Sequence, residues 1–328
     1  MGGQNSSEKE IKLKTPHKEA IIMVNLNDAK KLYSQKKYNE SLEIYEELFA
    51  KDPDSFTKQN LISYSWTIYQ VHVKNFGDED ELFDAVDLIT ELIPQADLNR
   101  TKICPYTFSV FKVLEYLMDK KEFYNMSEWL DLLEVERLDE NDSKYSKSRK
   151  EFYYEYASKS SLECAEWETC IEISAEALKT VKTFAKDGDV WHKWRMAKAY
   201  RELKDYDRAL ECLRQVEKSK KEWFVYREFS ENYCLLGDLR NALKYVKPAI
   251  LAEGSPKMKV NLYCLAFKLL EEISPEIAYL HAELCYIIKK ENRYEIPDEL
   301  EELMSEKDNL DKNQLIEIIE SYWASIKD

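Results

Sequence analysis

A four-residue frame of apolar and small side chains recurs along this chain. Its first clear copy consists of Tyr38, Ser41, Tyr45 and Leu48, separated by steps of three, four and three residues. These steps place the four side chains on one face of an α-helix. Pro53 comes shortly afterwards and marks the end of that helix. The pattern predicts an amphipathic helix with one apolar face.

Six further copies of the frame follow, and most of them have a small residue in the second position. A small side chain at that position lets two neighbouring helices approach closely. Seven copies predict an all-α fold, an α-solenoid of stacked antiparallel helix pairs with about seven units. The six copies are Leu82, Ala85, Ile89, Leu92; Phe123, Met126, Leu130, Leu133; Trp167, Cys170, Ser174, Ala177; Tyr206, Ala209, Leu213, Val216; Leu239, Ala242, Val246, Ala249; and Pro275, Ala278, Ala282, Cys285.

Three segments resemble the tetratricopeptide repeat (TPR), a helix pair of about 34 residues. They are residues 196–210, 232–243 and 32–53, and the second has Gly237 at the turn glycine of the motif. Units two to four depart from the family pattern because they lack this glycine, and the third has the large Met126 where a small residue is expected. The resemblance implies a divergent TPR array.

The order of segments along the chain predicts three regions. Residues 1–17 are polar and are expected to form a disordered leader, residues 18–295 to form the repeat array, and residues 296–328 to form capping helices. A stack of repeats needs such caps because its last helix has one uncovered apolar face. Within the cap, Pro297 and the acidic residues after it suit a helix start, and residues 311–326 form a second amphipathic pattern.

Composition and charge narrow the class of protein. The 328 residues are 44% hydrophobic and carry a formal net charge of −15, which opposes nonspecific binding to nucleic acid or to anionic lipid. No apolar run approaches the roughly 20 residues that cross a bilayer. We expect a cytoplasmic protein with no membrane span. Gly2 fits a loose myristoylation pattern, so lipidation of the N-terminus stays open.

The chain has few residues suited to catalysis or metal binding. Its six glycines are too scattered for a phosphate-binding loop, and it has four histidines. His281 and Cys285 share a helical face and could ligate a metal, but core packing is the expected role of this pair. The seven cysteines form no C-x-x-C pair and are expected to be reduced. We therefore expect no enzyme, no cofactor and no metal.

A candidate binding surface lies in the fifth unit. In TPR arrays the first helix of each pair lines a concave groove, and here that helix carries one stripe of aromatic and cationic side chains. Arg and Lys would favour an acidic peptide segment or a C-terminal carboxylate. The alternative is that the tryptophans pack against the fourth unit and the cations are solvated. The candidates are Trp191, Trp194, Lys198 and Arg201, with Arg227 and Tyr263 at the position of Trp194 in the next two units.

These observations favour a non-catalytic scaffold or adaptor that binds a protein or peptide. Two alternatives stay open: a peptide-sensing regulator or accessory subunit of a microbial conflict effector, and an RNA-binding helical repeat, which the net charge disfavours. Binding of Hsp70 or Hsp90 tails is not supported, because Leu26 and Lys30 occupy the positions where the carboxylate clamp of that TPR class has Lys and Asn. The partner and the oligomeric state do not follow from the sequence.

Overall fold

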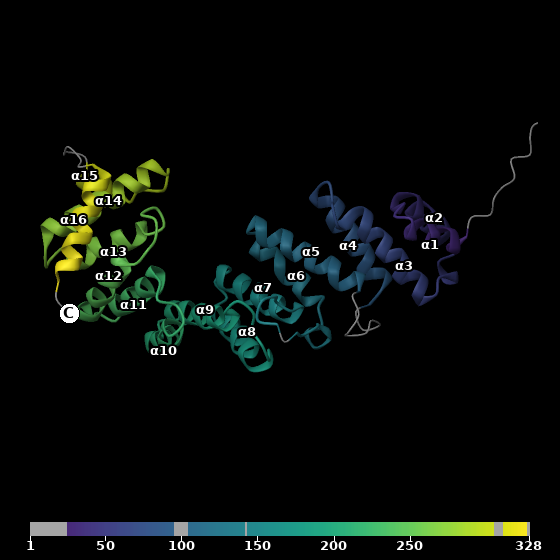
Figure 1. Cartoon of the computed structure of the whole chain (residues 1–328), viewed down its shortest axis with the longest axis horizontal. Helices are drawn as coiled ribbons and strands as arrows, with labels where there is room; N and C mark the ends of the chain where they lie inside the picture. Colours follow the sequence, from purple (N-terminus) through teal and green to yellow (C-terminus); the bar gives the residue numbers. More distant parts are fainter. Residues whose placement is uncertain (1–24, 95–103, 142, 305–310, 327–328) are drawn as a thin grey trace, which may run out of the picture. The chain divides into compact units, whose positions relative to one another are not determined.

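A computed structural model describes residues 25–94, 104–141, 143–304 and 311–326. Within these ranges the chain forms sixteen α-helices and no strand (Figure 1). The described residues divide into two compact units, one of residues 25–94 with 104–109 and one of the described residues from 110 onward. The helices of the first unit are α1 (Leu26–Ser34), α2 (Tyr38–Lys51), α3 (Lys58–Ile68) and α4 (Glu79–Leu92), and α5 (Pro105–Lys120) has residues in both units.

The second unit contains the remaining helices. They are α6 (Met126–Asp131), α7 (Arg149–Glu163), α8 (Trp167–Thr180), α9 (Gly188–Glu202), α10 (Tyr206–Glu217), α11 (Trp223–Leu235), α12 (Leu239–Leu251), α13 (Val260–Leu270), α14 (Pro275–Glu291), α15 (Asp298–Met304) and α16 (Lys312–Ser325).

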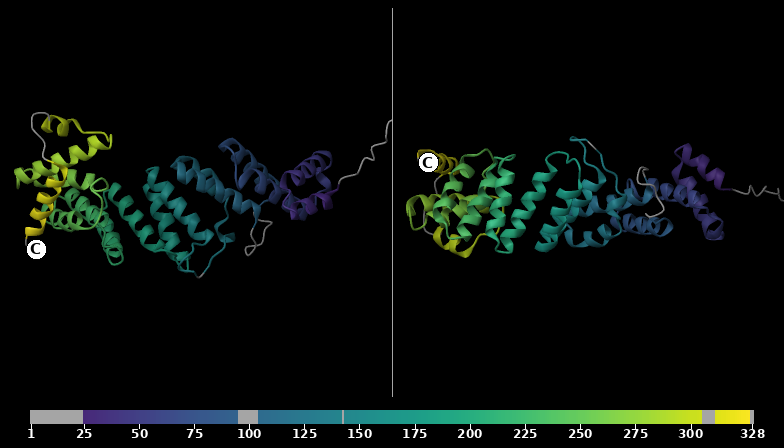
Figure 2. Two further views of the ribbon diagram at one scale, coloured as in Figure 1. Left: turned by 45° about the horizontal axis from the view of Figure 1, so that its top comes forward. Right: turned by 90° about the horizontal axis from the view of Figure 1, so that it is seen from below.

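The recurring frame falls on the second helix of each successive pair, from α2 to α14. In the first unit α1 packs on α2 and α3 on α4, and in the second α7 packs on α8, α9 on α10, α11 on α12 and α13 on α14. Within the second unit, each second helix also contacts the first helix of the next pair, as α8 does with α9 and α10 with α11 (Figure 2). The predicted all-α solenoid of stacked helix pairs is confirmed.

The second frame position lies at the contact between the two helices of a pair. Ser41 of α2 is fully buried, and its hydroxyl donates a hydrogen bond of 2.8 Å to the carbonyl of Ala29 in α1. Cys170 of α8 is also fully buried, and its thiol donates in the same way to the carbonyl of Ser158 in α7, at 3.3 Å. The shared geometry explains why small side chains recur here: a larger one would separate the two backbones.

The turn inside each pair has one backbone form in five of the seven pairs. A residue with φ between 61° and 74° follows the first helix, and the next residue donates its N–H back to a carbonyl five residues earlier, at 2.9–3.0 Å. This bond satisfies a carbonyl at the helix end. Only one of the five positions is glycine, so units three and four form this turn without the glycine of the motif, whereas the second pair has a different connection. The five residues are Lys36, Lys121, Ala165, Lys204 and Gly237.

The third unit departs from the predicted helix over residues 123–133. Phe123–Asn125 form a 3₁₀ turn, and α6 ends at Asp131, before the last frame residue, Leu133. Met126 is fully buried where other units have a small residue. In the first unit, α3 continues into a π-helical turn at Tyr69–Val73.

The predicted capping helices are present as α15 and α16. Helix α16 packs on α12 and α14 and buries Leu315, Ile319 and Trp323 against the core of the last pair. Helix α15 adds Leu300 and Met304 to the same core. The cap thus covers the apolar face that the last pair would otherwise expose. The region boundaries near residues 18 and 296 stay a prediction, and the predicted leader lies outside the described residues.

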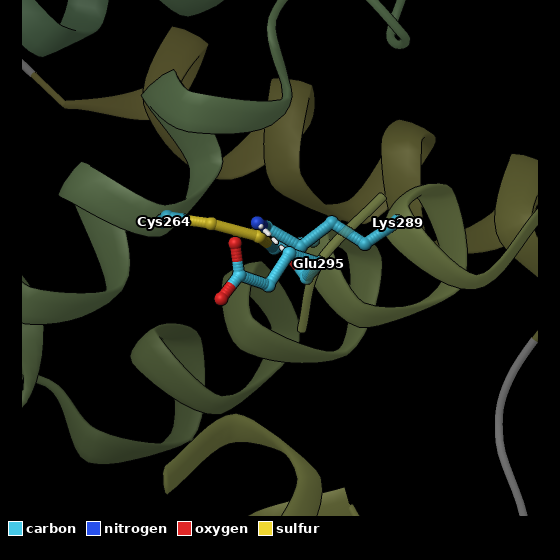
Figure 3. Close-up of a disulfide and its surroundings, with 4 residues drawn as sticks. Cys264, Lys289 and Glu295 are labelled. Carbon is cyan, nitrogen blue, oxygen red and sulfur yellow. Dashed lines mark hydrogen bonds between the residues drawn. A yellow bond between two sulfur atoms is a disulfide. The ribbon is translucent and has the colours of Figure 1, made fainter. Parts of the chain in front are cut away.

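Two of the seven cysteines are not reduced, which corrects the expectation for that pair. Cys264 of α13 and Cys285 of α14 form a disulfide (Figure 3). The packing of α13 on α14 brings their Cα atoms to 5.9 Å, within the range that a disulfide bridges. The two residues are 21 positions apart, and only the register of the two helices shows that they meet. The other five cysteines are free.

Candidate functional site

Helix α9 begins at a tight turn that needs a glycine. Lys186 and Asp187 both have positive φ, and Gly188 then starts the helix. A Cβ at Gly188 would lie 2.9 Å from the ring of Phe184, so a side chain there would displace that ring. The predicted stripe lies on the face of α9 that contacts α11.

An aromatic cluster joins α9 to α11. The ring of Trp191 stacks on Phe224 with centroids 6.0 Å apart, and Trp194 meets the same ring edge to face at 6.1 Å. Trp223 adds a further edge contact to Phe224 at 6.0 Å. All four rings are partly exposed. Trp191 and Trp194 therefore pack against α11, the first helix of the sixth unit, and both rings still present surface to solvent.

Cations of the same chain lie over these rings. The amine of Lys198 is 4.8 Å from the Trp194 ring centroid, and the guanidinium of Arg227 is 5.7 Å from that of Trp223. Lys198 has no carboxylate within ion-pair distance in the part of the chain that the structure describes. We call Trp191, Trp194, Lys198, Arg201, Trp223, Phe224 and Arg227 the α9–α11 surface.

The two arginines of this surface are already paired. Nη1 of Arg201 lies 2.5 Å from a carboxylate oxygen of Glu228 and 2.6 Å from one of Glu231. Arg227 pairs with the same two acids at 3.0 and 3.1 Å. The Glu228 side chain is only 1% exposed. Arg201 thus holds α9 to α11, whereas the pairs of Arg227 lie within α11. Neither arginine presents a whole guanidinium to a ligand.

Burial and charge shift the pKa values within this network. Burial raises the pKa of Glu231, and repulsion from Glu228 raises it further. Burial alone would lower the pKa of Arg201, but the carboxylates of Glu228 and Glu231 reverse the shift and raise it. The arginine therefore stays charged within the pair.

Tyr263, the sixth predicted residue, lies elsewhere in the packing. It is 3% exposed and belongs to the core formed by the last helix pair and the cap. Burial raises the pKa of its hydroxyl to about 12. Tyr263 therefore offers almost no surface to a ligand, whereas the other five predicted residues lie together on α9 and α11.

Sequence reasoning missed two buried residues on the opposite side of α9. His192 and Arg195 lie toward α7 and are 2% and 6% exposed. Burial and the charges of Arg195 and Lys147 lower the pKa of His192 to about 3, and burial lowers the pKa of Arg195. One sequence feature could have indicated this site: Arg195 is charged at a position where the helical periodicity predicts an apolar side chain.

His281 is a core residue, as expected from its position. It is fully buried, Nδ1 lies 2.8 Å from the carbonyl of Ile277, and Nε2 accepts a 2.9 Å hydrogen bond from the indole N–H of Trp323. Nδ1 is therefore the protonated nitrogen of a neutral ring. The sulfur of Cys285 is bonded to Cys264, so this pair does not form a metal site.

The described residues contain neither a metal cluster nor a membrane-spanning helix. Among them no cluster of three or more His, Cys, Asp and Glu side chains is arranged to hold a metal ion. No helix in the described ranges has both the length and the apolar character that crossing a membrane requires.

Comparison with known proteins gives one family match. The model of a domain of unknown function, DUF7017, matches residues 190–324, from α9 to α16 and less than half of the chain. No curated protein matches the sequence.

Similar solved structures include three helical proteins. A tetratricopeptide repeat protein from Parabacteroides merdae has 12% identity and a TM-score of 0.42, covering 85% of this chain and 96% of its own. The apo form of RapI has 15% identity and a TM-score of 0.49, covering 92% and 85%. Cut9, in the APC/C hetero-tetramer Cut9–Hcn1, has 10% identity and a TM-score of 0.42, covering 89% and 55%. None of these values assigns a function to this chain.

Proposed function

We propose that this chain is a non-catalytic scaffold or adaptor that binds a protein or peptide partner on the α9–α11 surface. The observation that carries the proposal is the cluster of four partly exposed aromatic rings on the first helices of two consecutive pairs. Aromatic and arginine side chains are enriched in the cores of protein interfaces. Because the ion pairs fix α9 against α11, the rings are held in place before a partner arrives.

An acidic segment is the partner chemistry that the cations support. Lys198 is partly exposed and is not ion-paired within the described part of the chain, so its amine can donate to a carboxylate. Arg201 and Arg227 contribute positive potential but keep their own acids. The local cations are thus nearly balanced by carboxylates, which leaves the RNA-binding alternative without support.

Affinity capture with matched variants tests this proposal. The tagged protein is used to capture partners from an extract of its native host, alongside a Trp191→Ala, Lys198→Glu variant and a Lys244→Glu control. Lys244 is exposed on α12, a helix that contributes no residue to the surface. We expect one partner whose capture falls at least tenfold in the double variant, since a charged hydrogen bond contributes about 1.5–3 kcal/mol, and is unchanged in the control. Equal capture of the partner by all three proteins would show that the α9–α11 surface is not its binding site.

A further inference from the structure

A small hollow lies between α7 and α9, beside the α9–α11 surface. Its volume is about 10 Å³, which is the space of one water-sized atom. Trp191 belongs both to the hollow and to the α9–α11 surface. The hollow is lined by Lys147, Glu151, Glu155, Phe184, Gly188, Trp191, His192 and Arg195.

Arg195 lines this hollow without an ion-pair partner among the described residues. Its side chain is almost fully buried, and Nε has no hydrogen-bond partner. Nη2 lies 3.4 Å from Nδ1 of His192, which is a weak contact. In the described part of the chain no carboxylate lies within ion-pair distance of this guanidinium. Buried charged groups are normally paired, so this arginine needs a further explanation.

The two acids of the hollow are held by other groups. A carboxylate oxygen of Glu155 accepts from the amine of Lys147 at 2.5 Å. Glu151 accepts from the backbone N–H groups of Ser148 and Ala185 and from the Ser148 hydroxyl. Glu155 is close enough to Arg195 to interact through its charge, but its hydrogen bond goes to the lysine. The guanidinium of Arg195 therefore faces the hollow with bonding capacity to spare.

We infer that this hollow receives one oxygen of a carboxylate from an acidic side chain of the protein partner, bound by Arg195. This inference rests on the proposed function, because the partner must lie across Trp191 to reach the hollow. A guanidinium donates charge-assisted hydrogen bonds to a carboxylate. A singly charged carboxylate suits a site flanked by Glu151 and Glu155, whereas a phosphate dianion would meet stronger repulsion from both.

Formate, the smallest carboxylate, is the probe for this site in the free protein. The Nε–H resonance of Arg195 is observed by NMR during a formate titration and assigned by its loss in an Arg195→Met variant. We expect a saturable shift of this resonance. The Nε–H of Arg208, which is paired with Asp205 on α10, should move only slightly and without saturation. The indole N–H of Trp191, which also lines the hollow, reports formate binding in the Arg195→Met variant, and this binding should be at least about tenfold weaker.

Thermal unfolding separates binding from a structural role of Arg195. If the guanidinium is kept for a partner, Met at this position removes a buried charge that has no bonded anion, and the melting temperature should stay the same or rise. A structural arginine would instead lower the melting temperature when replaced. A lower melting temperature without a saturable formate shift would overturn the assignment.

Two further anions test the carboxylate assignment. If chloride or inorganic phosphate shifts the Arg195 resonance at the same concentration as formate, the hollow is not a carboxylate site. The titration needs no partner protein, so its failure is distinct from failure of partner capture. Partner capture could depend on Trp191 and Lys198 while formate causes no shift. This result would refute the carboxylate site in the hollow and would still support the α9–α11 surface as the binding site.

Discussion

Glu228 is the most deeply buried acid that pairs with the arginines of the α9–α11 surface. Its carboxylate is shared by Arg201 and Arg227. Removing one partner of a buried ion pair leaves a charge without compensation. Arg201 is therefore a structural residue as well as a surface residue, and its replacement should affect folding before it affects binding.

We expect Arg201→Met to lower the free energy of unfolding by about 3 kcal/mol, because Glu228 and Glu231 then share one guanidinium. Urea unfolding measures this loss. The matched control is Arg208→Met, since Arg208 is 61% exposed and pairs with Asp205 near the start of α10. The control should leave the urea midpoint almost unchanged. Equal midpoints for the two variants would contradict the assigned role of Arg201.

Two buried histidines should make stability depend on pH. Burial lowers the pKa of His192 from 6.5 to about 3 and that of His281 to about 4. Between these values and 6.5, the unfolded chain binds a proton at each ring and the folded chain does not. The free energy of unfolding therefore falls on acidification, by at most about 1.4 kcal/mol per pH unit for each histidine.

Urea unfolding at pH 7.5 and at pH 5 measures this dependence, in a range above the titration of most carboxylates. We expect lower stability at pH 5, and a smaller loss in a His192→Gln variant, which has no ring to protonate. A wild-type midpoint that does not fall between the two pH values would show that these rings are not held neutral by burial.

At the residue scale, the sequence predicted which side chains of α9 share a face but not which partners they meet. The helical period places Trp191, Trp194, Lys198 and Arg201 in one stripe. Their contacts on α11 lie about thirty positions away, and periodicity within one helix carries no information on them. Tyr263 occupies the equivalent position two units later, yet the cap packs near it and buries it.

At the scale of elements, the turn within a helix pair forms with or without the glycine of the repeat motif. Ala165 and Gly237 occupy equivalent turns with φ of 61° and 74°. A left-handed conformation costs an L-residue about 1–2 kcal/mol, and glycine avoids this cost. The first, third and fourth pairs therefore form this turn with a residue that is strained in it.

We expect Ala165→Gly to stabilise the protein, by up to about 1 kcal/mol once the entropy of the unfolded chain is counted. Gly237→Ala should destabilise it by a similar amount, and only through the backbone, because nothing lies within 4 Å of the added Cβ. The pair of opposite shifts in urea midpoint is the measurement. Shifts of the same sign would contradict this account of the turn.

The elements that the sequence misplaced have local causes. The frame over residues 123–133 has the right spacing, but Met126 fills the position of a small residue and the backbone starts as a 3₁₀ turn. Spacing records the apolar face and says little about whether the hydrogen-bond ladder is continuous. For the same reason, residue spacing could not predict the π-helical turn after α3.

For the whole molecule, repetition made the fold predictable. One frame is typical of any amphipathic helix, whereas seven copies specify a stack of pairs, and a stack requires a cap. The covalent connection between α13 and α14 was not predictable, because Cys264 and Cys285 meet only through the register of two helices. The unusual charge environment of Arg195 likewise depends on the packing of α9 against α7.

The disulfide determines how many free thiols the protein has, and this number can be measured. Thiol titration of protein prepared without reductant and unfolded in urea should find five thiols, and seven after reduction. Peptide mapping should then assign the difference to Cys264 and Cys285. Seven reactive thiols before reduction would contradict the presence of this bond in solution.

The central claim is that a protein partner lies on the α9–α11 surface, and site-specific photo-crosslinking in the native host tests it most directly. A photoreactive phenylalanine replaces Trp191 in one protein and, in a control, Tyr124, which is 83% exposed in the 3₁₀ turn before α6. We expect position 191 to crosslink to one partner and position 124 not to. No crosslink at 191, or the same product at both positions, would contradict the claim.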